Sequence, residues 1–475
     1  MILKIKGLDG VGFVGFFMPR SVLFSGNLPE EYVIWHFLFL FANFASSKNE
    51  ATMKVNQRIS GEVSVYEFQV GSSDSGITGF CCADRGIKLF ENQYLLPDGM
   101  TYNSYIIDDD HIAVMDTVDH NVMDQWLPAV KEWMKSHDGR RPDFLVVHHL
   151  EPDHSGALSL FLSEFPDCTV VCSVKAAQMM PHFVPDMDFS RIMTVKEGDT
   201  LELGRHTLRF ISAPMVHWPE VIMTYESTTR TLFSADAFGT FGTSLATGIA
   251  TGETDQSRLA ELWPDEARRY YINICGKYGP QVQSAMKKFD TVLVDVICPL
   301  HGPIIALGDY PATVSLYETW SSYVAEFPEK VFIAVATLHG FTLEAARELR
   351  EMLAQEGVDA HVADLAETDL SGDVAWAFAD AATVFMSATY DAGLTPAMRD
   401  FLGRLKSKNW QKRCAAVVEN GSWAPVAGKL ISAELSGMKD IETIGEIVTI
   451  HTRLDEESRA ALRNLAQAIA ARIKA

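Results

Sequence analysis

The sequence predicts an α/β protein with two domains of different architecture. Short apolar strands separated by turns and a few helices fill residues 100–300, whereas strands and helices alternate regularly after residue 328. Regular strand–helix alternation is typical of a doubly wound parallel sheet. The chain has 475 residues, of which 47% are hydrophobic, so it can bury a large core and form two or three domains.

The amino terminus differs from the rest of the chain. Residues 11–24 and 32–45 are apolar, but each run is shorter than the ~20 residues that span a bilayer. Met53 opens the stretch MKVNQRISGEV, which is typical of the start of a soluble protein. We therefore predict that residues 1–52 are either an apolar N-terminal extension or the product of a misplaced start, and that they lie outside the functional fold.

Charge and cysteine content exclude several classes of function. Forty basic residues against 62 acidic ones give a net charge of −22, which repels nucleic acid and anionic membranes. We expect neither as a partner. The seven cysteines form no C-x-x-C pair, which argues against a thiolate zinc or iron–sulfur module. Their irregular spacing fits a reducing cytoplasm.

The first domain, predicted over residues 53–327, consists mainly of strands. SYIIDDDHIAVMDT (104–117) reads as a hairpin, and MDQWLPAVKEWMKSH (123–137) has helical spacing of its apolar residues. DFLVVHHL (143–150) is a buried strand, and SGALSLFLSEF (155–165) continues as a helix. Further strands are expected at TVVCSV (169–174), TLRFIS (207–212), VIMTYES (221–227), TLFSAD (231–236) and TVLVDVICPL (291–300).

The second domain, predicted over residues 328–475, begins where the pattern changes. VFIAVATLHGFT (331–342) is a strand and a loop, followed by the helix LEAARELREMLAQEG (343–357). Three more strands are expected in VDAHVADL (358–365), ATVFMSATYDAG (382–393) and CAAVVENGSW (414–423). The last two lead into polar loops, and such loops lie at one edge of a parallel sheet.

A dense cluster of polar residues follows the strand at 143–150. His149, Glu151, Asp153 and His154 form the pattern H-x-E-x-D-H. In a loop at a strand end, residues two apart can turn toward one centre while their neighbours serve a second. Imidazole nitrogens and carboxylate oxygens together suit iron, zinc or manganese.

Three more residues at strand ends extend this cluster. They are His217 in SAPMVHWPE, His301 in ICPLHGP, and Asp236, which ends the strand TLFSAD. A carboxylate at Asp236 could bridge two metals ~3.5–4 Å apart. Any one histidine alone is more often structural, and we assign His148 as a neighbour at the strand end. Eight further histidines are also expected to be structural: His36, His111, His120, His137, His182, His206, His361 and His451.

The order H-x-[EH]-x-D-H, followed at long intervals by His, Asp and His, resembles the metallo-β-lactamase fold. Most members of that superfamily have a histidine where this chain has Glu151, and the carboxylate resembles the flavodiiron proteins. LPDGMTYNSYII, MDTVD, APMVHWPE, LFSADAFG and CPLHGP are similar to that family as well. The resemblance covers roughly residues 83–475. It implies a metallo-β-lactamase-like αββα sandwich followed by a flavodoxin-like doubly wound parallel sheet.

The resemblance implies a non-haem diiron site. One iron would take His149, Glu151 and His217, the other Asp153, His154 and His301, with Asp236 bridging them. No catalytic residue is expected beyond these ligands. A carboxylate in place of a neutral imidazole adds negative charge, which favours the ferric state; zinc, which has no redox chemistry, would gain nothing from this.

The loops of the second domain imply FMN by the same resemblance. Thr337, Gly340 and Thr342 can offer hydroxyls and backbone N–H groups to a phosphate at a helix N-terminus. Tyr390 and Trp423 could flank a flat ring. His339 and Phe341 depart from the residues usual in the family. The expected FMN-binding residues are Thr337, Leu338, His339, Gly340, Phe341, Thr342, Ser387, Ala388, Thr389, Tyr390, Asp391, Gly393, Asn420, Gly421, Ser422 and Trp423.

The implied function is a cytoplasmic oxidoreductase. Electrons would pass from an external donor, rubredoxin or a similar small protein, through FMN to the diiron site, which reduces O2 to water, NO to N2O, or both. A head-to-tail homodimer or a dimer of such dimers is expected. Two alternatives remain open: a zinc hydrolase of the metallo-β-lactamase fold fused to a flavodoxin-like domain, and a flavin-only electron carrier.

Overall fold

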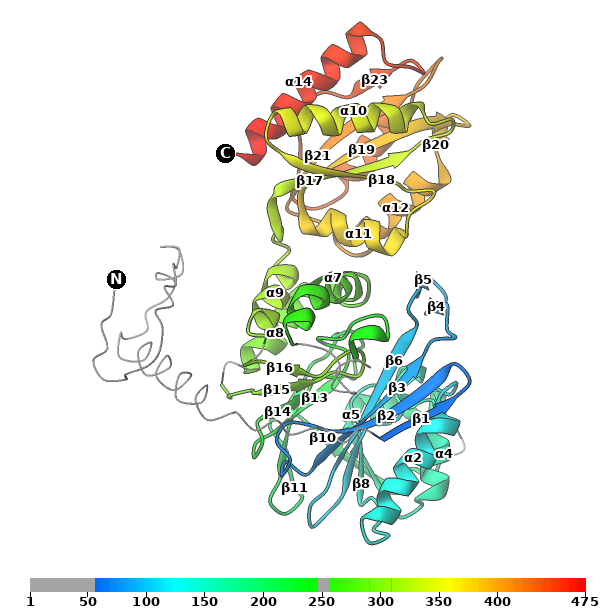
Figure 1. The fold of residues 1–475 in the computed structure, drawn as a ribbon, viewed down its shortest axis with the longest axis vertical. Helices are drawn as coiled ribbons and strands as arrows, with labels where there is room; N and C mark the ends of the chain where they lie inside the picture. Colours follow the sequence, from blue (N-terminus) through cyan, green and yellow to red (C-terminus); the bar gives the residue numbers. More distant parts are fainter. Residues whose placement is uncertain (1–55, 186, 247–255, 290, 309) are drawn as a thin grey trace, which may run out of the picture. The chain divides into compact units, whose positions relative to one another are not determined.

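The computed structural model describes residues 56–185, 187–246, 256–289, 291–308 and 310–475 (Figure 1). The predicted extension, residues 1–52, lies outside these ranges. Within them, no helix is both long enough and apolar enough to cross a membrane. All seven cysteines are buried free thiols.

The first domain contains two β-sheets. The larger has the strand order β1 (Asn56–Ser60), β2 (Val63–Gln69), β3 (Ile77–Asp84), β6 (Met100–Ile107), β7 (Ala113–Met115), β8 (Phe144–Val147), β9 (Thr169–Ser173) and β10 (Ile192–Val195). The smaller has the order β11 (Thr200–Glu202), β12 (Thr207–Ser212), β13 (Ile222–Glu226), β14 (Thr231–Phe233), β15 (Val296–Cys298) and β16 (Ile305–Ala306). β6 and β7 form the expected antiparallel hairpin.

Helices cover the outer face of each sheet. On the larger sheet, α2 (Met123–Ser136) packs on β2 and β3, and α5 (Val174–Met179) packs on β9 and β10. Between β8 and β9 the chain forms the short turn α3 (Pro152–Ser155) and then α4 (Leu158–Glu164), whose Phe161 contacts Trp126 of α2. On the smaller sheet, α8 (Gly279–Phe289) packs against β12, and α9 (Ala312–Ser321) packs against both α8 and α7 (Gln256–Ile274). The layers follow the order helix, sheet, sheet, helix, and the predicted αββα sandwich is confirmed.

A continuous apolar layer fills the space between the two sheets. Phe68 and Tyr105 come from the larger sheet, and Phe210 and Phe233 come from the smaller. The rings of Tyr105 and Phe233 meet edge to face with centroids 5.3 Å apart. Phe210 is fully buried. This layer fixes the two sheets against each other and so fixes the loops that leave them.

The second domain is a parallel sheet with the flavodoxin strand order. Its strands run in the order β18 (Asp359–Asp364), β17 (Phe327–Ala336), β19 (Asp380–Tyr390), β21 (Arg413–Asn420) and β22 (Ile441–Thr443), and β23 (Val448–Ile450) also pairs with β21. The pairings between these strands are parallel. Counted from β17, the order is 2-1-3-4-5, which confirms the doubly wound prediction.

Helices lie on both faces of this sheet (Figure 1). On one face, α10 (Phe341–Gln355) and α14 (Glu456–Ile473) pack against each other and against Val331, Ile333 and Val335 of β17. On the other face, α11 (Leu370–Ala379), α12 (Pro396–Ser407) and α13 (Ala427–Ser436) cover Phe332 and Phe385.

Some elements differ from the sequence expectations. The strand expected over 291–300 is only Val296–Cys298, because its neighbours β14 and β16 are three and two residues long and offer no longer ladder. Helices α11, α12, α13 and α14 were not predicted. The short strands β22 and β23 were not predicted either, since three residues carry too little pattern to stand out.

Arg269 of α7 ties the two domains together. Its guanidinium donates to the backbone oxygen of Leu95 at 3.0 Å, to Ser371 Oγ at 2.9 Å and to an Asp369 carboxylate oxygen at 3.2 Å. Asn273, one helical turn further on, donates to the Ser371 carbonyl at 3.0 Å. These bonds hold α7 against the start of α11.

Truncating Phe210 to alanine should destabilise the sandwich strongly. The side chain is fully buried between the sheets, and such a change costs about 3–5 kcal/mol. Guanidinium unfolding followed by circular dichroism measures the loss. Leu160→Ala on α4, where 36% of the leucine is exposed, is the control and should cost less than about 1 kcal/mol. Equal losses would contradict the assigned core.

Candidate functional site

The H-x-E-x-D-H stretch folds as a strand end followed by one helical turn. His149 lies just after β8, Glu151 is the N-cap residue of α3, and Pro152 occupies the first helical position, where a missing N–H costs nothing. The N–H groups of His154 and Ser155 both donate to the Glu151 carbonyl at 2.9 Å. This turn places Asp153 and His154 on a different side from His149 and Glu151.

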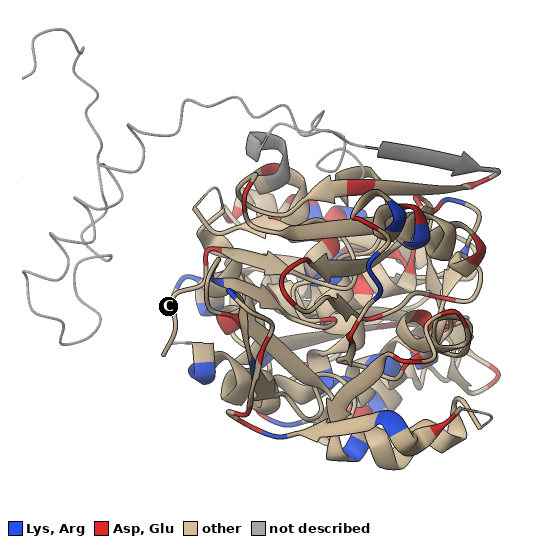
Figure 2. Cartoon of the chain, turned by 90° about the horizontal axis from the view of Figure 1, so that it is seen from below, with Lys and Arg blue, Asp and Glu red and all other residues tan. Residues whose placement is uncertain are grey.

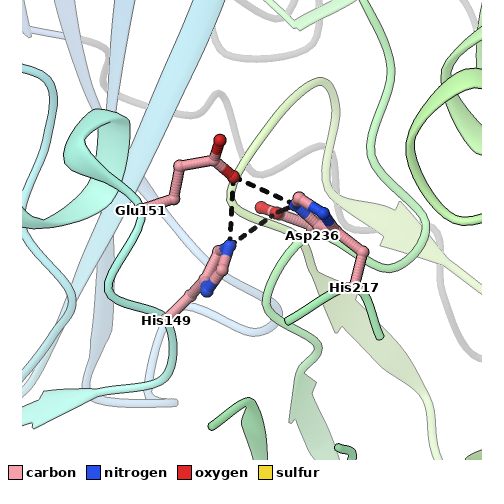
Figure 3. A group of neighbouring side chains, drawn as sticks. All are labelled: His149, Glu151, His217 and Asp236. Atoms are coloured by element: carbon pink, nitrogen blue, oxygen red, sulfur yellow. Dashed lines mark hydrogen bonds and ion pairs between the residues drawn. The ribbon is translucent and has the colours of Figure 1, made fainter. Parts of the chain in front are cut away.

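One group of potential metal ligands contains His149, Glu151, His217 and Asp236 (Figure 3). Their ligand atoms all lie within 4.8 Å of one another. A Glu151 carboxylate oxygen is 3.2 Å from His149 Nε2 and 3.0 Å from His217 Nε2. Asp236 Oδ2 is 3.1 Å from His217 Nε2 and 3.5 Å from His149 Nε2. The four atoms surround one point, as the ligands of a single ion do.

A second group contains Asp153, His154 and His301. Asp153 Oδ2 is 3.2 Å from His154 Nε2 and 3.1 Å from His301 Nε2. The other oxygen of Asp236, Oδ1, is 2.9 Å from His154 Nε2 and 3.7 Å from His301 Nε2. Asp236 therefore presents one oxygen to each group, which is the arrangement of a carboxylate that bridges two ions.

The loop that carries Asp236 is firmly held. Ser234 Oγ donates to the Ala237 carbonyl at 2.7 Å, and the Leu300 N–H donates to the Ala235 carbonyl at 2.9 Å. The Phe238 N–H donates to the hydroxyl of Tyr317 on α9. Asp236 itself is 1% exposed. The Asp236 carboxylate is thus preorganised rather than free to rotate into solvent.

Two outer contacts, which the sequence did not predict, orient the histidines. His149 Nδ1 lies 2.8 Å from Glu220 Oε1, and His301 Nδ1 lies 2.6 Å from the carbonyl oxygen of Thr101. With Nδ1–H donating to an oxygen, Nε2 keeps its lone pair for the centre of the site. Glu220 follows His217 by three residues in the stretch HWPE, and this closeness to a predicted ligand could have indicated its role. Nothing in the sequence around Thr101 indicates its contact with His301.

The carboxylates of the site stabilise positive charge on the groups around them. Burial opposes protonation of His154, yet the carboxylates of Asp153 and Asp236 raise its pKa to about 9. His217 is likewise buried, and its contacts with Asp236 and Glu151 raise its pKa to about 9. Burial alone would raise the pKa of Asp236, but the imidazoles around it hold that pKa well below its usual range. Such a site favours a cation.

Glu91 stands beside the first group. It lies at the tip of the hairpin formed by β4 (Leu89–Phe90) and β5 (Tyr94–Leu95). The residue is exposed, but the loss of water around its carboxyl group and the charge of Glu151 raise its pKa to about 7. The carboxyl can therefore hold a proton at neutral pH. No sequence signal indicated it.

His148 lies apart from both groups. Its Nδ1 contacts an Asp116 carboxylate oxygen, and its Nε2 lies 2.8 Å from Thr224 Oγ1. The His148 carbonyl accepts from the Ile222 N–H at 3.2 Å. The residue links the two sheets next to the site, with both ring nitrogens engaged.

The three expected FMN loops meet at the carboxyl edge of the second sheet. Asn420, at the end of β21, donates to Thr342 Oγ1 at 3.3 Å. Thr389 Oγ1 accepts from the N–H groups of Val426 and Ala427 at 3.0 and 3.2 Å. These hydrogen bonds bring together the loops that follow β17, β19 and β21.

Within this edge the expected residues divide into two kinds. Ser387 and Thr342 are buried, and Thr337 Oγ1 accepts from the Gly340 N–H at 3.0 Å, so their hydroxyls shape the loops. Tyr390 and Trp423 are 46% and 83% exposed, so their rings are available to a ligand. Leu338 is exposed too. The remaining expected residues lie in the same loops or at the ends of the elements that flank them: His339, Gly340, Phe341, Ala388, Asp391, Gly393, Gly421 and Ser422.

A fourth loop, missed in the sequence, joins this edge. The Thr452 N–H donates to Asn420 Oδ1 at 2.9 Å, and Asn420 Nδ2 donates back to the Thr452 carbonyl at 3.0 Å. The Arg453 guanidinium lies over the Phe341 ring, 4.5 Å from its centroid. This loop follows β23, whose three residues gave no clear strand pattern, and it adds a cation beside the N-terminus of α10.

Comparison with known proteins agrees with this arrangement. Residues 100–302 match the family described as ODP family beta lactamase. Diflavin flavoprotein A 1 of Synechocystis sp. is 31% identical over 295 residues, which are 62% of this chain and 49% of that protein. The nitric oxide reductase of Moorella thermoacetica is 29% identical over 375 residues, 78% of this chain and 90% of that protein. The chain thus spans about half of the first relative and most of the second.

The fold has solved counterparts. The rubredoxin oxygen:oxidoreductase of Desulfovibrio gigas superposes with a TM-score of 0.77 at 24% identity, over 86% of this chain and 99% of that one. The likeness covers both the sandwich and the parallel sheet. At this identity the likeness shows the fold alone. The relatives named above and the Glu151-containing ligand pattern show that the chain is a homologue of diflavin flavoprotein A and of nitric oxide reductase, with the fold of the flavodiiron proteins.

Proposed function

We propose that this protein is an oxidoreductase that reduces O2 to water, NO to N2O, or both, at a diiron site supplied with electrons through FMN. The observation that carries the proposal is Asp236, whose two oxygens face two separate groups of imidazoles and carboxylates. The names of its relatives, a nitric oxide reductase and a diflavin flavoprotein, support the same chemistry.

The residues present fit two iron ions. Among the described residues, buried Asp153 Oδ1 and Oδ2, His154 Nε2, Asp236 Oδ1 and His301 Nε2 make no hydrogen bond. Unsatisfied buried polar atoms are costly, and a cation would satisfy the atoms that face the centre of the group: Asp153 Oδ2, His154 Nε2, Asp236 Oδ1 and His301 Nε2. His149, Glu151 and His217 would hold one ion, Asp153, His154 and His301 the other, and Asp236 would bridge them.

The residues at the second sheet's edge fit FMN. Helix α10 starts at Gly340 without a side-chain cap, so its first N–H groups are free to bind a phosphate. Arg453 adds positive charge beside that position, and the exposed rings of Tyr390 and Trp423 suit the isoalloxazine. When bound, iron and FMN supply one-electron redox chemistry that no side chain of this chain can perform.

The protein's own residues prepare the site for reduction. Glu220 and Thr101 fix the tautomers of His149 and His301. The carboxyl group of Glu91 holds a proton beside Glu151 with a pKa of about 7, so it is placed to deliver a proton to an oxygen-containing product. We further propose that a rubredoxin or a similar small protein in the cytoplasm donates the electrons, and that a head-to-tail homodimer, alone or paired, is the working form.

Metal and flavin content, followed by anaerobic turnover, test the proposal. We expect about two irons and one FMN per chain. The reduced protein is then mixed with O2 and NO separately, and the gas consumed faster names the substrate. Zinc without gas consumption would instead favour the alternative, a hydrolase of the metallo-β-lactamase fold. FMN without any metal would favour the flavin-only carrier.

Asp236→Asn should disrupt the metal pair. The amide keeps the shape but removes the negative charge that both groups share, so we expect less than one iron per chain and a loss of gas reduction of at least about 100-fold. FMN content should not change. Elemental analysis and gas electrodes measure both effects. Asp167→Asn, on an aspartate whose side chain is 86% exposed, should behave like the wild type; full activity in the iron-depleted variant would refute the assignment.

Glu220→Gln should weaken metal binding while leaving the ligands in place. The glutamine carbonyl accepts more weakly from His149 Nδ1–H, and a change of this kind costs about 10–100-fold in metal affinity. Competition with a chelator measures it. Glu226→Gln is a matched control, because Glu226 is also fully buried and pairs with a histidine, His206, at 3.1 Å. Equal losses in both variants would mean that the effect is general destabilisation.

Gly340→Ala should reduce FMN affinity and leave iron unchanged. Gly340 has φ of +86°, and nothing lies within 4 Å of an added Cβ, so the cost is backbone strain of about 1–2 kcal/mol. That strain corresponds to about a tenfold weaker Kd if the loop relaxes away from the bound form. Flavin fluorescence titration measures it. Gly403→Ala on α12, with open space and no left-handed backbone, should not alter FMN binding.

A further inference from the structure

A cavity of about 530 Å³ lies where the two domains meet, away from both sites described above. The first domain contributes Lys277 and Tyr278, in the turn between α7 and α8, and Gln281 in the first turn of α8. The second contributes Lys406 at the end of α12 and Lys439 after α13. A volume of this size is within the range of small-molecule sites. Its position would let one ligand contact both domains.

The charge of this cavity is opposite to that of the chain. Three lysines line it, and none of the described residues that line it is acidic, although the whole chain carries −22. Lys406 pairs with Glu434 at 3.1 Å, but both side chains are about half exposed, so water screens the pair strongly. Lys439 is 3.9 Å from Asp440, and both are more exposed still. The lysines therefore keep most of their attraction for an anion.

Polar and flat groups complete the lining. Asn409, whose side chain donates to the Lys277 carbonyl at 2.9 Å, holds the wall contributed by the second domain against the first. Gln281 is exposed and offers an amide. Tyr278 and Met438, both partly buried, present an aromatic ring and an apolar side chain. Lysines beside an aromatic and apolar wall suit a ligand that has both an anionic group and a planar ring.

The cavity is separate from the proposed flavin edge. Trp410 and Gln411 line it just before β21 begins, whereas the flavin loops follow the other end of this strand at Asn420. Eight residues of strand span about 26 Å. An electron donor docked at the cavity would lie that far from the flavin of its own chain, which argues for a small ligand rather than a redox partner.

We propose that this cavity, named here the lysine cavity and defined by Lys277, Tyr278, Gln281, Lys406, Asn409 and Lys439, binds a small phosphorylated metabolite of the nucleotide class. The lysines bind the phosphates as point charges, and Tyr278 with Met438 accommodates the flat base. Because both domains contribute to it, ligand binding would also stabilise the junction between them.

Isothermal titration of ADP into the full, FMN-saturated protein tests the proposal. We expect binding that weakens between 50 and 500 mM salt, as charge–charge contacts do. The double variant Lys277→Gln/Lys439→Gln should bind at least about tenfold more weakly, because two of three cations are lost. Lys135→Gln, an exposed lysine at the end of α2, is the matched control and should bind as the wild type does.

Each other outcome overturns part or all of the proposal. No ADP binding to the wild type, or equal binding by the double variant, refutes the site. Adenosine binding as tightly as ADP refutes the role of phosphate, whereas pyrophosphate binding as tightly as ADP refutes the role of the base. Displacement of ADP by excess FMN would mean that ADP had entered the flavin edge. None of these measurements requires iron or gas turnover, so the result is independent of the proposed reductase activity.

Discussion

The buried carboxylate of Asp236 is the constraint on which this structure depends. Two oxygens lie among four imidazole rings, 1% exposed to water. A carboxylate in that position is costly unless positive charge surrounds it. Without metal, protons on the histidines supply that charge, which is why the pKa of His154 and that of His217 rise to about 9. A pair of metal ions can replace these protons.

The sheet register explains how ligands distant in sequence reach this carboxylate. Phe233 of β14 pairs with Cys298 of β15 in a parallel ladder. Asp236 lies three residues after Phe233, and His301 lies three residues after Cys298. The two ligands therefore follow neighbouring strands at the same edge of the sheet and at matching positions. Across the sandwich, the His148 carbonyl accepts from the Ile222 N–H at 3.2 Å. This bond ties the end of β8, and hence His149, to the strand that follows the His217 loop.

The sequence revealed what is local and missed what is long-range. His149, Glu151, Asp153 and His154 lie within six residues, so their spacing alone indicated a metal, and the strand–helix alternation indicated the second sheet. Glu220 acts on a histidine 71 positions away, and Thr101 on one 200 positions away. Such contacts exist only once the sheets are packed. The loop of Thr452 and Arg453 was missed for a different reason: β23 is too short to show a period.

Local imbalance of charge, rather than the net charge of −22, determines what each part of the chain can bind. Basic and acidic residues are interspersed in the view of Figure 2, and at physiological salt their fields decay within about 8 Å. When the four imidazoles are neutral, as metal ligands must be, the carboxylates of Glu151, Asp153 and Asp236 leave the ligand cluster negative, and Glu151 makes it more negative than a histidine would. That extra negative charge favours an ion that can become ferric. In the lysine cavity the local charge is positive instead. Three lysines and no carboxylate line it, although acidic residues are in excess in the chain as a whole.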